Sequence, residues 1–138
     1  MKEPREYTYF VDRDLGSKFP ALLRAAGLKV ERLDDHFPPN TPDEKWLAEV
    51  SRRGWLAVTR DGRIRYSPLA LQVLMTSGAK LFVLVGKLTP DECAEVFLHR
   101  RNRIDHIARA ESAAFIAKIR RDGVFMWCRH AEWSKSQR

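Results

Sequence analysis

The chain has 138 residues, of which 44% are hydrophobic and 31% are charged. This balance is typical of one folded domain and excludes an intrinsically disordered chain, and no apolar run approaches the roughly 20 residues that a membrane-spanning helix needs. The formal net charge is +7, and residues 99–138 contribute most of it, with ten Lys or Arg against four Asp or Glu. A neutral body with a basic end favours a polyanionic partner, most simply nucleic acid, over a charge that serves solubility alone.

Strand and helix patterns alternate along residues 7–86. Aromatic and β-branched runs predict strands over 7–11, 28–33, 55–59 and 80–85. Apolar residues at helical spacing predict helices between them, over 17–27, 42–54 and 67–78. Ser17 and Thr41 are placed to cap the first two helices, and Gly27 and Gly54 to end them. The intervening stretches 34–42 and 60–66 predict a loop and a polar turn.

The rest of the chain adds a long helix and a hairpin. The helical pattern over 89–110 begins at Thr89, a plausible cap, and two alternating runs over 115–129 are joined through Asp122-Gly123, a common hairpin turn. Strands separated by helices predict a mostly parallel sheet of about four strands with helices on both faces. We therefore expect one α/β domain over residues 1–138, with its core at 7–86 and a basic C-terminal helix and hairpin at 89–130.

Neither the N-terminus nor the cysteines indicate secretion. The stretch MKEPREYTYF contains acids and no apolar segment, so we expect no secretory signal and a cytoplasmic protein. Cys93 and Cys128 stand alone, without a second Cys or a His at ligand spacing. They predict two buried thiols instead of a disulfide or a zinc site.

Acidic residues follow the predicted strands. The first strand ends at Asp12, with Asp14 two residues on, and Asp61 follows the third strand. Asp34 and Asp35 end the second strand, or form the turn that follows it. Because ligands collect at the carboxyl ends of parallel strands, we expect the strand-end carboxylates to share one edge. Their mutual repulsion favours a bound cation, and carboxylates without His or Cys suit Mg²⁺ or Mn²⁺.

Each acid also has a structural interpretation. Asp43 and Glu44 lie in the first turn of a predicted helix, where acids favour the helix dipole. Asp61 belongs to a common turn dipeptide, and Asp14 can cap the helix that follows it. Asp12 is the hardest to explain in this way, because it ends an apolar strand where burial without a partner costs about 1–3 kcal/mol. The convergence of the strand ends favours a metal site.

The ordered stretches FVDRDLG and LLRAAGLKVERLDDHFPPNTPDEKWLAEVSRRGWLAVTRD resemble the PIN-like domains of the VapC-type toxin group, including small proteins with a Mut7-C-like core. The resemblance runs from about Tyr9 to Gly86 and lies in the order and spacing of several motifs. It implies a PIN-like three-layer α/β fold and a Mg²⁺- or Mn²⁺-dependent ribonuclease, commonly the toxin of a toxin–antitoxin pair. Small nucleases of this kind are often dimers, so a homodimer is a further expectation.

The resemblance also implies site residues. Asp12 matches the acid that ends the first strand, Asp43 in TPDEKW the acid that opens the second helix, and Asp61 in TRD the acid after the third strand. These three are the expected metal ligands, and Glu44 or Asp14 would orient the attacking water. The fourth acid of ordinary PIN nucleases, expected after the fourth strand, has no counterpart here. The reduced acidic set would bind one ion.

Basic and aromatic residues complete the expected RNA surface. Arg60, Arg63 and Arg65 surround Asp61 and are suited to hold phosphates. Further cations lie along the last helix, at Arg100, Arg101 and Arg103, and suit RNA or an acidic antitoxin segment. Trp127 and Trp133 can stack on bases of single-stranded RNA, whereas Trp127 can also pack in the core.

Two functions follow from these patterns. The first is a metal-dependent endoribonuclease that hydrolyses phosphodiester bonds of RNA, as the toxin of a type II toxin–antitoxin pair. The alternative is a non-catalytic RNA-binding or regulatory module with a PIN-like fold, in which the acidic edge has no catalytic role. Cleavage that requires a divalent metal ion separates the two.

Overall fold

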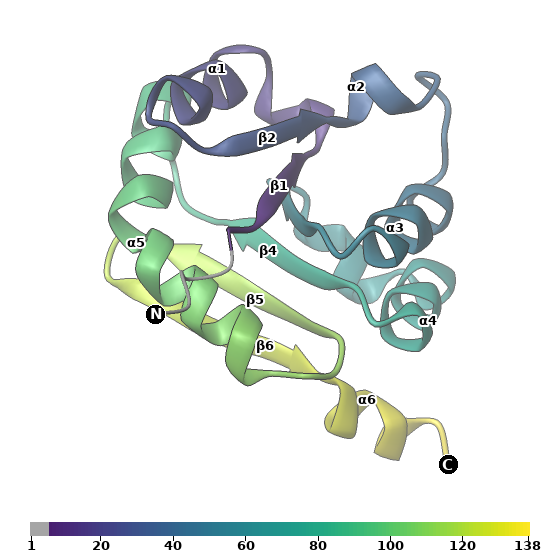
Figure 1. Cartoon of the computed structure of the whole chain (residues 1–138). Coiled ribbons are helices and arrows are strands. Elements are labelled where there is room, and N and C mark those ends of the chain that lie inside the picture. Colours follow the sequence, from purple (N-terminus) through teal and green to yellow (C-terminus); the bar gives the residue numbers. More distant parts are fainter. Residues whose placement is uncertain (1–5) are drawn as a thin grey trace.

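The structure is a computed structural model that describes residues 6–138, and it forms a six-stranded sheet between two layers of helices (Figure 1). The strands are β1 (Thr8–Val11), β2 (Lys29–Arg32), β3 (Leu56–Thr59), β4 (Lys80–Leu84), β5 (Phe115–Arg120) and β6 (Gly123–Arg129). Their spatial order is β2-β1-β3-β4-β5-β6, and all neighbours are parallel except β5 and β6. Residues 1–5 of the N-terminal stretch, where we expect no secretory signal, lie outside the described residues.

The helices cover both faces of this sheet. They are α1 (Lys18–Ala25), α2 (Leu33–His36), α3 (Asp43–Arg52), α4 (Pro68–Ser77), α5 (Pro90–Ala110) and α6 (His130–Ser136), together with the 3₁₀ helices η1 (Arg13–Leu15) and η2 (Gly62–Tyr66). Buried residues of α1 and α5 pack on one face, and those of α3 and α4 on the other. Within residues 6–138, no helix combines the length and the apolar character needed to cross a membrane.

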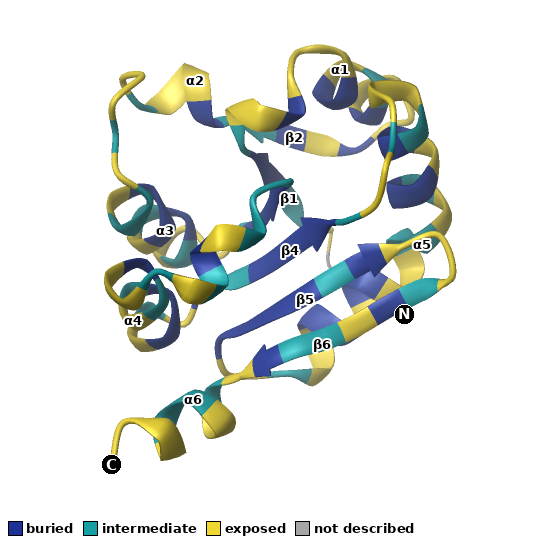
Figure 2. Ribbon diagram, turned by 180° about the vertical axis from the view of Figure 1, so that it is seen from behind, coloured by how far each residue is buried: buried dark blue, intermediate teal, exposed yellow. Residues whose placement is uncertain are grey.

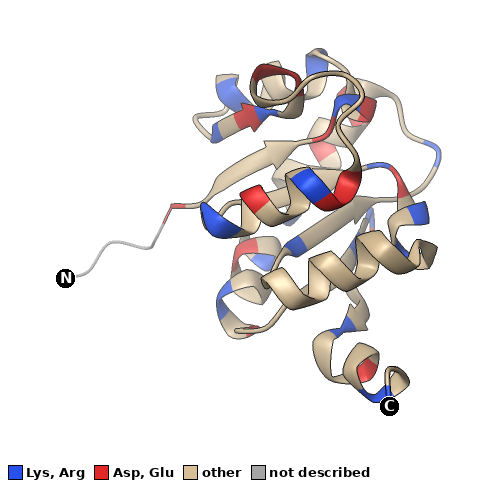
Figure 3. Ribbon diagram, turned by 90° about the vertical axis from the view of Figure 1, so that its right-hand side faces the viewer, with Lys and Arg blue, Asp and Glu red and all other residues tan. Residues whose placement is uncertain are grey.

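Two hydrophobic clusters hold the layers together. On the α1 and α5 side, Tyr9 and Phe19 each pack edge-to-face on Phe97, with ring centroids 5.2 and 5.7 Å apart. On the other side, Phe10 stacks on Trp46 with centroids 5.7 Å apart. Neighbouring strand residues point to opposite faces, so the inner strands are buried on both (Figure 2). The two helices on this second face differ in charge. Helix α3 begins with acids and ends with a basic residue, whereas α4 has no charged residue (Figure 3).

The predicted α/β fold is confirmed, and the sheet is larger than expected. The sequence indicates a sheet of about four strands followed by a long helix and a hairpin, and in the structure β5 also joins this sheet, pairing in parallel with β4 from Lys80↔Phe115 to Leu84↔Ile119. The helix α5 brings the chain back to the end of the sheet at which β4 begins, so that β5 can run parallel to β4. There β5 is buried at four of its first five residues. The hairpin therefore adds two strands to the sheet.

Local details depart from expectation at helix ends. Thr89 forms the predicted cap, because its side chain accepts from the Glu92 N–H and Glu92 accepts from the Thr89 N–H. Thr41 does not cap α3; its hydroxyl donates to the Pro38 carbonyl at 2.8 Å, and Ser17 forms no side-chain cap bond to α1. The expected loop 34–42 begins with the single turn α2, and α6 follows the hairpin where the sequence pattern predicts no helix.

Candidate active site

Two acids meet at the edge of the sheet where β1 and β3 end. The parallel ladder of these strands reaches Val11↔Val58, and a further backbone bond from the Asp12 N–H to the Val58 carbonyl, 3.0 Å long, carries the pairing one residue beyond β1. Asp12 then caps η1 by accepting from the Arg13 N–H at 2.7 Å. This tight turn brings Asp14 back to the same edge.

The buried hydroxyl of Thr59 connects the two acids. Thr59 Oγ1 lies 2.8 Å from Asp12 Oδ2 and 3.1 Å from Asp14 Oδ2, and it accepts from the Asp61 N–H at 3.0 Å. Asp14 also accepts from the Arg60 N–H. A hydroxyl has one proton to donate, so it can satisfy only one of the two carboxylates at a time. The pair therefore has room for one additional positive charge, either a proton or a cation.

The pKa values of the two acids also favour an additional positive charge between them. Burial, followed by the charge of Asp14, raises the pKa of Asp12 to about 6, and the more distant charge of Asp43 adds to this rise. Burial also raises the pKa of Asp14, against the hydrogen bonds from Arg60 and Thr59. Both carboxylates are thus destabilised in their charged forms at neutral pH. Asp14, for which the sequence leaves a capping role open, is hydrogen-bonded here to Thr59 and Arg60.

Asp43 and Glu44 lie in the first turn of α3, as expected from the sequence. The indole Nε1 of Trp46 donates to Asp43 Oδ1 at 3.0 Å and fixes the orientation of that carboxylate. Trp46 is itself buried and stacks on Phe10 of β1, so α3 is held firmly against the sheet. Asp43 therefore faces the edge from a rigid helix, and its charge acts on Asp12.

Asp61 differs from the other acids because it is already neutralised. Arg63 donates to both of its oxygens, from Nε at 2.9 Å and from Nη2 at 3.0 Å, and the Arg63 N–H adds a third bond. The side-chain bonds from Arg63 lower the pKa of Asp61. Arg63 is 91% exposed at its side chain, so the ion pair is at the surface and can open when a ligand approaches.

Arg13 holds the segment between β2 and α3, a role that the sequence pattern does not reveal. Its Nε donates to Asp34 Oδ1 at 2.8 Å, and its Nη atoms donate to the carbonyls of Pro39 and Pro38. Asp34 also faces Arg32 at 3.6 Å. The acids that follow β2 are therefore in ion pairs with arginines and do not join the pair formed by Asp12 and Asp14.

Three further arginines that the sequence places on the expected RNA surface lie in two regions of the structure. Arg60 donates to the carbonyls of Leu84 at 3.0 Å and Gly86 at 2.8 Å, so it ties the end of β3 to the end of β4. Arg100 donates to the Arg121 carbonyl, and Arg101 faces Asp105 at 3.6 Å. These contacts occupy their guanidinium groups within the fold.

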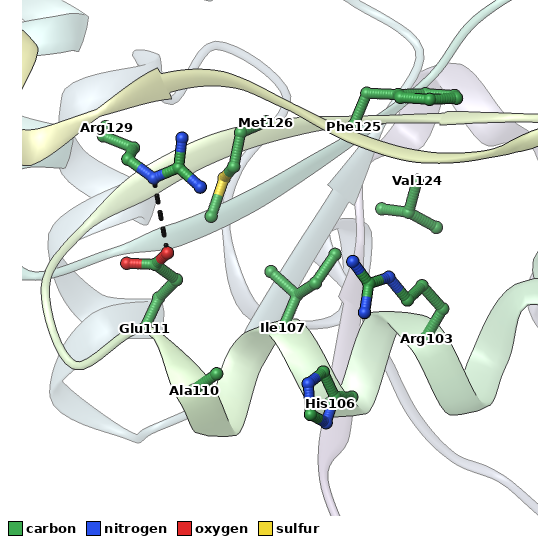
Figure 4. A pocket seen from close by; sticks show the side chains of 9 residues that line it. All are labelled: Arg103, His106, Ile107, Ala110, Glu111, Val124, Phe125, Met126 and Arg129. Atoms are coloured by element: carbon green, nitrogen blue, oxygen red, sulfur yellow. Dashed lines mark hydrogen bonds and ion pairs between the residues drawn. The ribbon is translucent and has the colours of Figure 1, made fainter.

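Arg103 has a different environment from its neighbours on α5. It lines a groove of about 360 Å³ between α5 and β6, in which Arg129 pairs with Glu111 at 3.3 Å (Figure 4). The groove contains one acid beside two arginines and a histidine. Arg65, by contrast, lies on η2, close to Asp61 in the chain.

A divalent cation suits the chemistry of the acid pair. Among residues 6–138, no group of three or more His, Cys, Asp or Glu side chains stands ready to hold a metal ion. Arg63 pairs with Asp61 and Trp46 donates to Asp43, whereas the carboxylates of Asp12 and Asp14 converge on the Thr59 hydroxyl. Mg²⁺ commonly binds through one or two carboxylates and keeps several waters, so two acids are a sufficient donor set.

Thr59 is the site residue that the sequence pattern misses. A threonine at the end of an apolar strand is ordinary, because β-branched residues are common in strands. The signal that could have identified it is its place between two acids in space, which requires the register of β1 and β3.

Comparisons with known proteins concern the part of the chain that carries these acids. The family model described as "PIN like domain" matches residues 8–86, which include Asp12, Asp14, Asp43, Thr59 and Asp61. The chain is 33% identical over 78 residues to the Mycobacterium tuberculosis (strain ATCC 25618 / H37Rv) protein named "Putative ribonuclease VapC45", covering 53% of this chain and 56% of that protein. The chain thus matches about half the length of this relative. No solved structure matches the chain significantly. Since the family model covers more than half of the residues, the chain belongs to the PIN-like domain family.

Proposed function

We propose that this protein is a divalent-metal-dependent ribonuclease that hydrolyses phosphodiester bonds of RNA. The observation that carries the proposal is the convergence of Asp12 and Asp14 on Thr59, with the pKa values of both acids raised. Membership of the PIN-like family and the ribonuclease name of the relative support it.

Asp12 and Asp14 would hold Mg²⁺ or Mn²⁺ through their carboxylate oxygens. When bound, the ion would lower the pKa of a coordinated water and offset charge on the phosphate. Thr59 would keep both carboxylates in one orientation through its hydroxyl. Asp43, and Glu44 beside it, would accept the proton of the attacking water, and Arg63 would exchange its bond to Asp61 for one to phosphate. Direct ligation by Asp43 and Asp61 stays a prediction of the resemblance.

A cleavage assay with single-stranded RNA tests this proposal. We expect cleavage with Mg²⁺ or Mn²⁺, loss of cleavage in EDTA, and loss in Asp12→Asn. Glu95→Gln, which removes an exposed acid from α5, serves as the matched control and should cleave normally. Mg²⁺ should also raise the melting temperature of the wild type and not that of Asp12→Asn, which reports binding independently of activity.

The alternative, an RNA-binding module without catalysis, predicts a different pair of results. RNA would bind equally with and without Mg²⁺, no cleavage would occur in either condition, and Asp12→Asn would bind as the wild type does. That outcome would refute the ribonuclease proposal. This alternative is included because residues 6–138 contain no group of three or more His, Cys, Asp or Glu side chains that could hold a metal ion.

We also propose that the protein acts as the toxin of a toxin–antitoxin pair, which the VapC name of its relative supports. The partner would be a protein that blocks RNA cleavage when bound. Co-expression with the product of a neighbouring small reading frame, followed by purification of a stable inactive complex, tests this pairing; a free and active nuclease would contradict it. The homodimer and the cytoplasmic location stay predictions of the sequence.

A further inference from the structure

Two aromatic side chains lie at η2, the 3₁₀ helix that follows Asp61. Tyr66, on η2, is 72% exposed, and its ring centroid lies 5.9 Å from that of Trp127 on β6. Trp127 packs against Gly62, where an added Cβ would stand only 3.2 Å from the indole ring. Because Gly62 follows Asp61 in the chain, the hairpin tryptophan touches the segment that carries one of the site acids.

Cations without acidic partners accompany these rings. Lys118 Nζ lies 4.0 Å from the centre of the Trp127 ring, and the Arg65 guanidinium lies 5.6 Å from that of Tyr66. Across residues 6–138, neither Lys118 nor Arg65 has an ion pair or a side-chain hydrogen bond. Buried Arg65 Nε also lacks an acceptor within that range. Within the described residues, no acidic side chain therefore neutralises either charge.

The surface continues along the hairpin. Phe125 is 44% exposed and stands opposite Lys118 in the β5–β6 ladder, with the Arg120 guanidinium 5.3 Å from its ring centre. The outer strand β6 contains buried, half-buried and exposed residues, unlike the inner strands that the helices cover (Figure 2). Aromatic rings and cations thus form one row, which we call the aromatic track: Tyr66, Trp127 and Phe125 with Arg65, Lys118 and Arg120.

We propose that the aromatic track binds single-stranded RNA and guides it to the acidic edge. The inference rests on the proposed ribonuclease function and names the form of its substrate. Exposed rings stack on unpaired bases, and adjacent cations hold the phosphates between them. Duplex RNA keeps its bases stacked on one another, so it cannot use the rings. Arg65 and Lys118, which stand unpaired beside Tyr66 and Trp127, favour a polyanion over an apolar protein segment, whereas Arg120 beside Phe125 pairs with Asp122 at 3.2 Å.

The track lies mostly outside the family match. Trp127, Phe125, Lys118 and Arg120 belong to the hairpin, whereas the family model ends at residue 86. The hairpin would therefore supply RNA affinity that the matched region alone lacks. It also gives Trp127 both roles left open by the sequence, because the side chain packs against the core and still presents part of its ring.

The first test measures binding of a short fluorescein-labelled single-stranded RNA by fluorescence anisotropy in EDTA, where cleavage is suppressed. Tyr66→Leu should raise Kd on the order of tenfold, because one base–ring stack is lost, whereas Tyr66→Phe should bind as the wild type does. Tyr66 is largely exposed, so both variants should fold, and circular dichroism checks this. Equal binding by Tyr66→Leu and the wild type would overturn the proposal, as would equal competition by duplex RNA of the same sequence.

The second test uses salt dependence to detect phosphate contacts. Lys118→Gln should lower the slope of log Kd against log salt concentration by roughly 0.7, the value for one phosphate on a single strand. Arg109→Gln removes the same charge from an exposed position on α5 and should leave the slope unchanged. The opposite assignment, with Arg109→Gln lowering the slope and Lys118→Gln not, would overturn the proposal and place RNA on α5.

These binding results are independent of catalysis. If Asp12→Asn abolishes cleavage while Tyr66→Leu binds normally, the track is refuted and the ribonuclease stands. If no condition yields cleavage while the track variants lose RNA, the ribonuclease is refuted and the track remains an RNA-binding surface.

Discussion

Asp12→Asn should make the metal-free protein more stable at neutral pH while it removes the proposed activity. In the folded protein, burial and the charge of Asp14 raise the pKa of Asp12 from 3.8 to about 6. The folded state therefore binds more protons than the unfolded state between about pH 4 and pH 6. The contribution of Asp12 to the free energy of unfolding is therefore greatest below about pH 4. It falls as the pH rises to about 6 and is constant above that pH.

The expected magnitude follows from the size of that pKa rise. A rise of about two pKa units corresponds to about 3 kcal/mol at 1.36 kcal/mol per unit. Solvent screening at this partly exposed edge reduces the value, so we expect Asp12→Asn to gain about 1–3 kcal/mol at about pH 7.5. The asparagine carbonyl can still accept from the Arg13 N–H, and its NH₂ group can donate to Thr59 Oγ1, which is then free to donate its proton to Asp14.

Urea unfolding followed by circular dichroism, in EDTA and at several pH values, measures this difference. The advantage of Asp12→Asn should be near zero at about pH 4 and should grow up to about pH 7. Asp61→Asn is the matched control, and its effect on stability should have the opposite sign. The pKa of Asp61 is lowered in the folded protein, so the stabilisation by this carboxylate is present above its unfolded pKa and is lost as the pH falls. A variant Asp12→Asn that is equally stable or less stable at pH 7.5 would refute the reasoning.

Three further substitutions test the surroundings of the site. Thr59→Val keeps the side-chain shape but leaves the Asp61 N–H without its acceptor; urea unfolding should show a loss of about 1–3 kcal/mol, and RNA cleavage should fall with it. Arg13→Gln releases the segment 34–42, so kcat/KM for RNA should fall while stability changes by less than about 1 kcal/mol; unchanged cleavage would show that the anchor is dispensable. Tyr9→Phe removes the 2.6 Å bond to buried Asp105 and should cost about 1–3 kcal/mol in unfolding experiments without affecting cleavage.

The acidic edge illustrates why part of the site is predictable from sequence. Alternating strands and helices indicate a parallel sheet, and a parallel sheet brings the carboxyl ends of β1 and β3 together whatever the side chains between them. Asp12 and Asp61 could thus be assigned to one edge from their positions after the strands alone. The helix starting at Asp43 was likewise predictable from its apolar spacing.

Other features depend on contacts between residues far apart in the chain. Thr59 joins Asp12 across 47 positions, and Arg13 binds Asp34 across 21, so no local pattern reveals either contact. The same holds for β5, whose pairing with β4 depends on where the long helix α5 returns the chain.

The amino-acid sequence by itself determined the α/β class, the order of the main elements and the edge at which the acids gather, because periodicity and strand connection are local properties. Only the tertiary structure decided which acids converge and which are neutralised. Asp12 and Asp14 share one hydroxyl, whereas Asp61 is paired with Arg63. The physical reason is that hydrogen bonds and charge pairs act over a few ångströms in space, at positions that only the packed strands bring together.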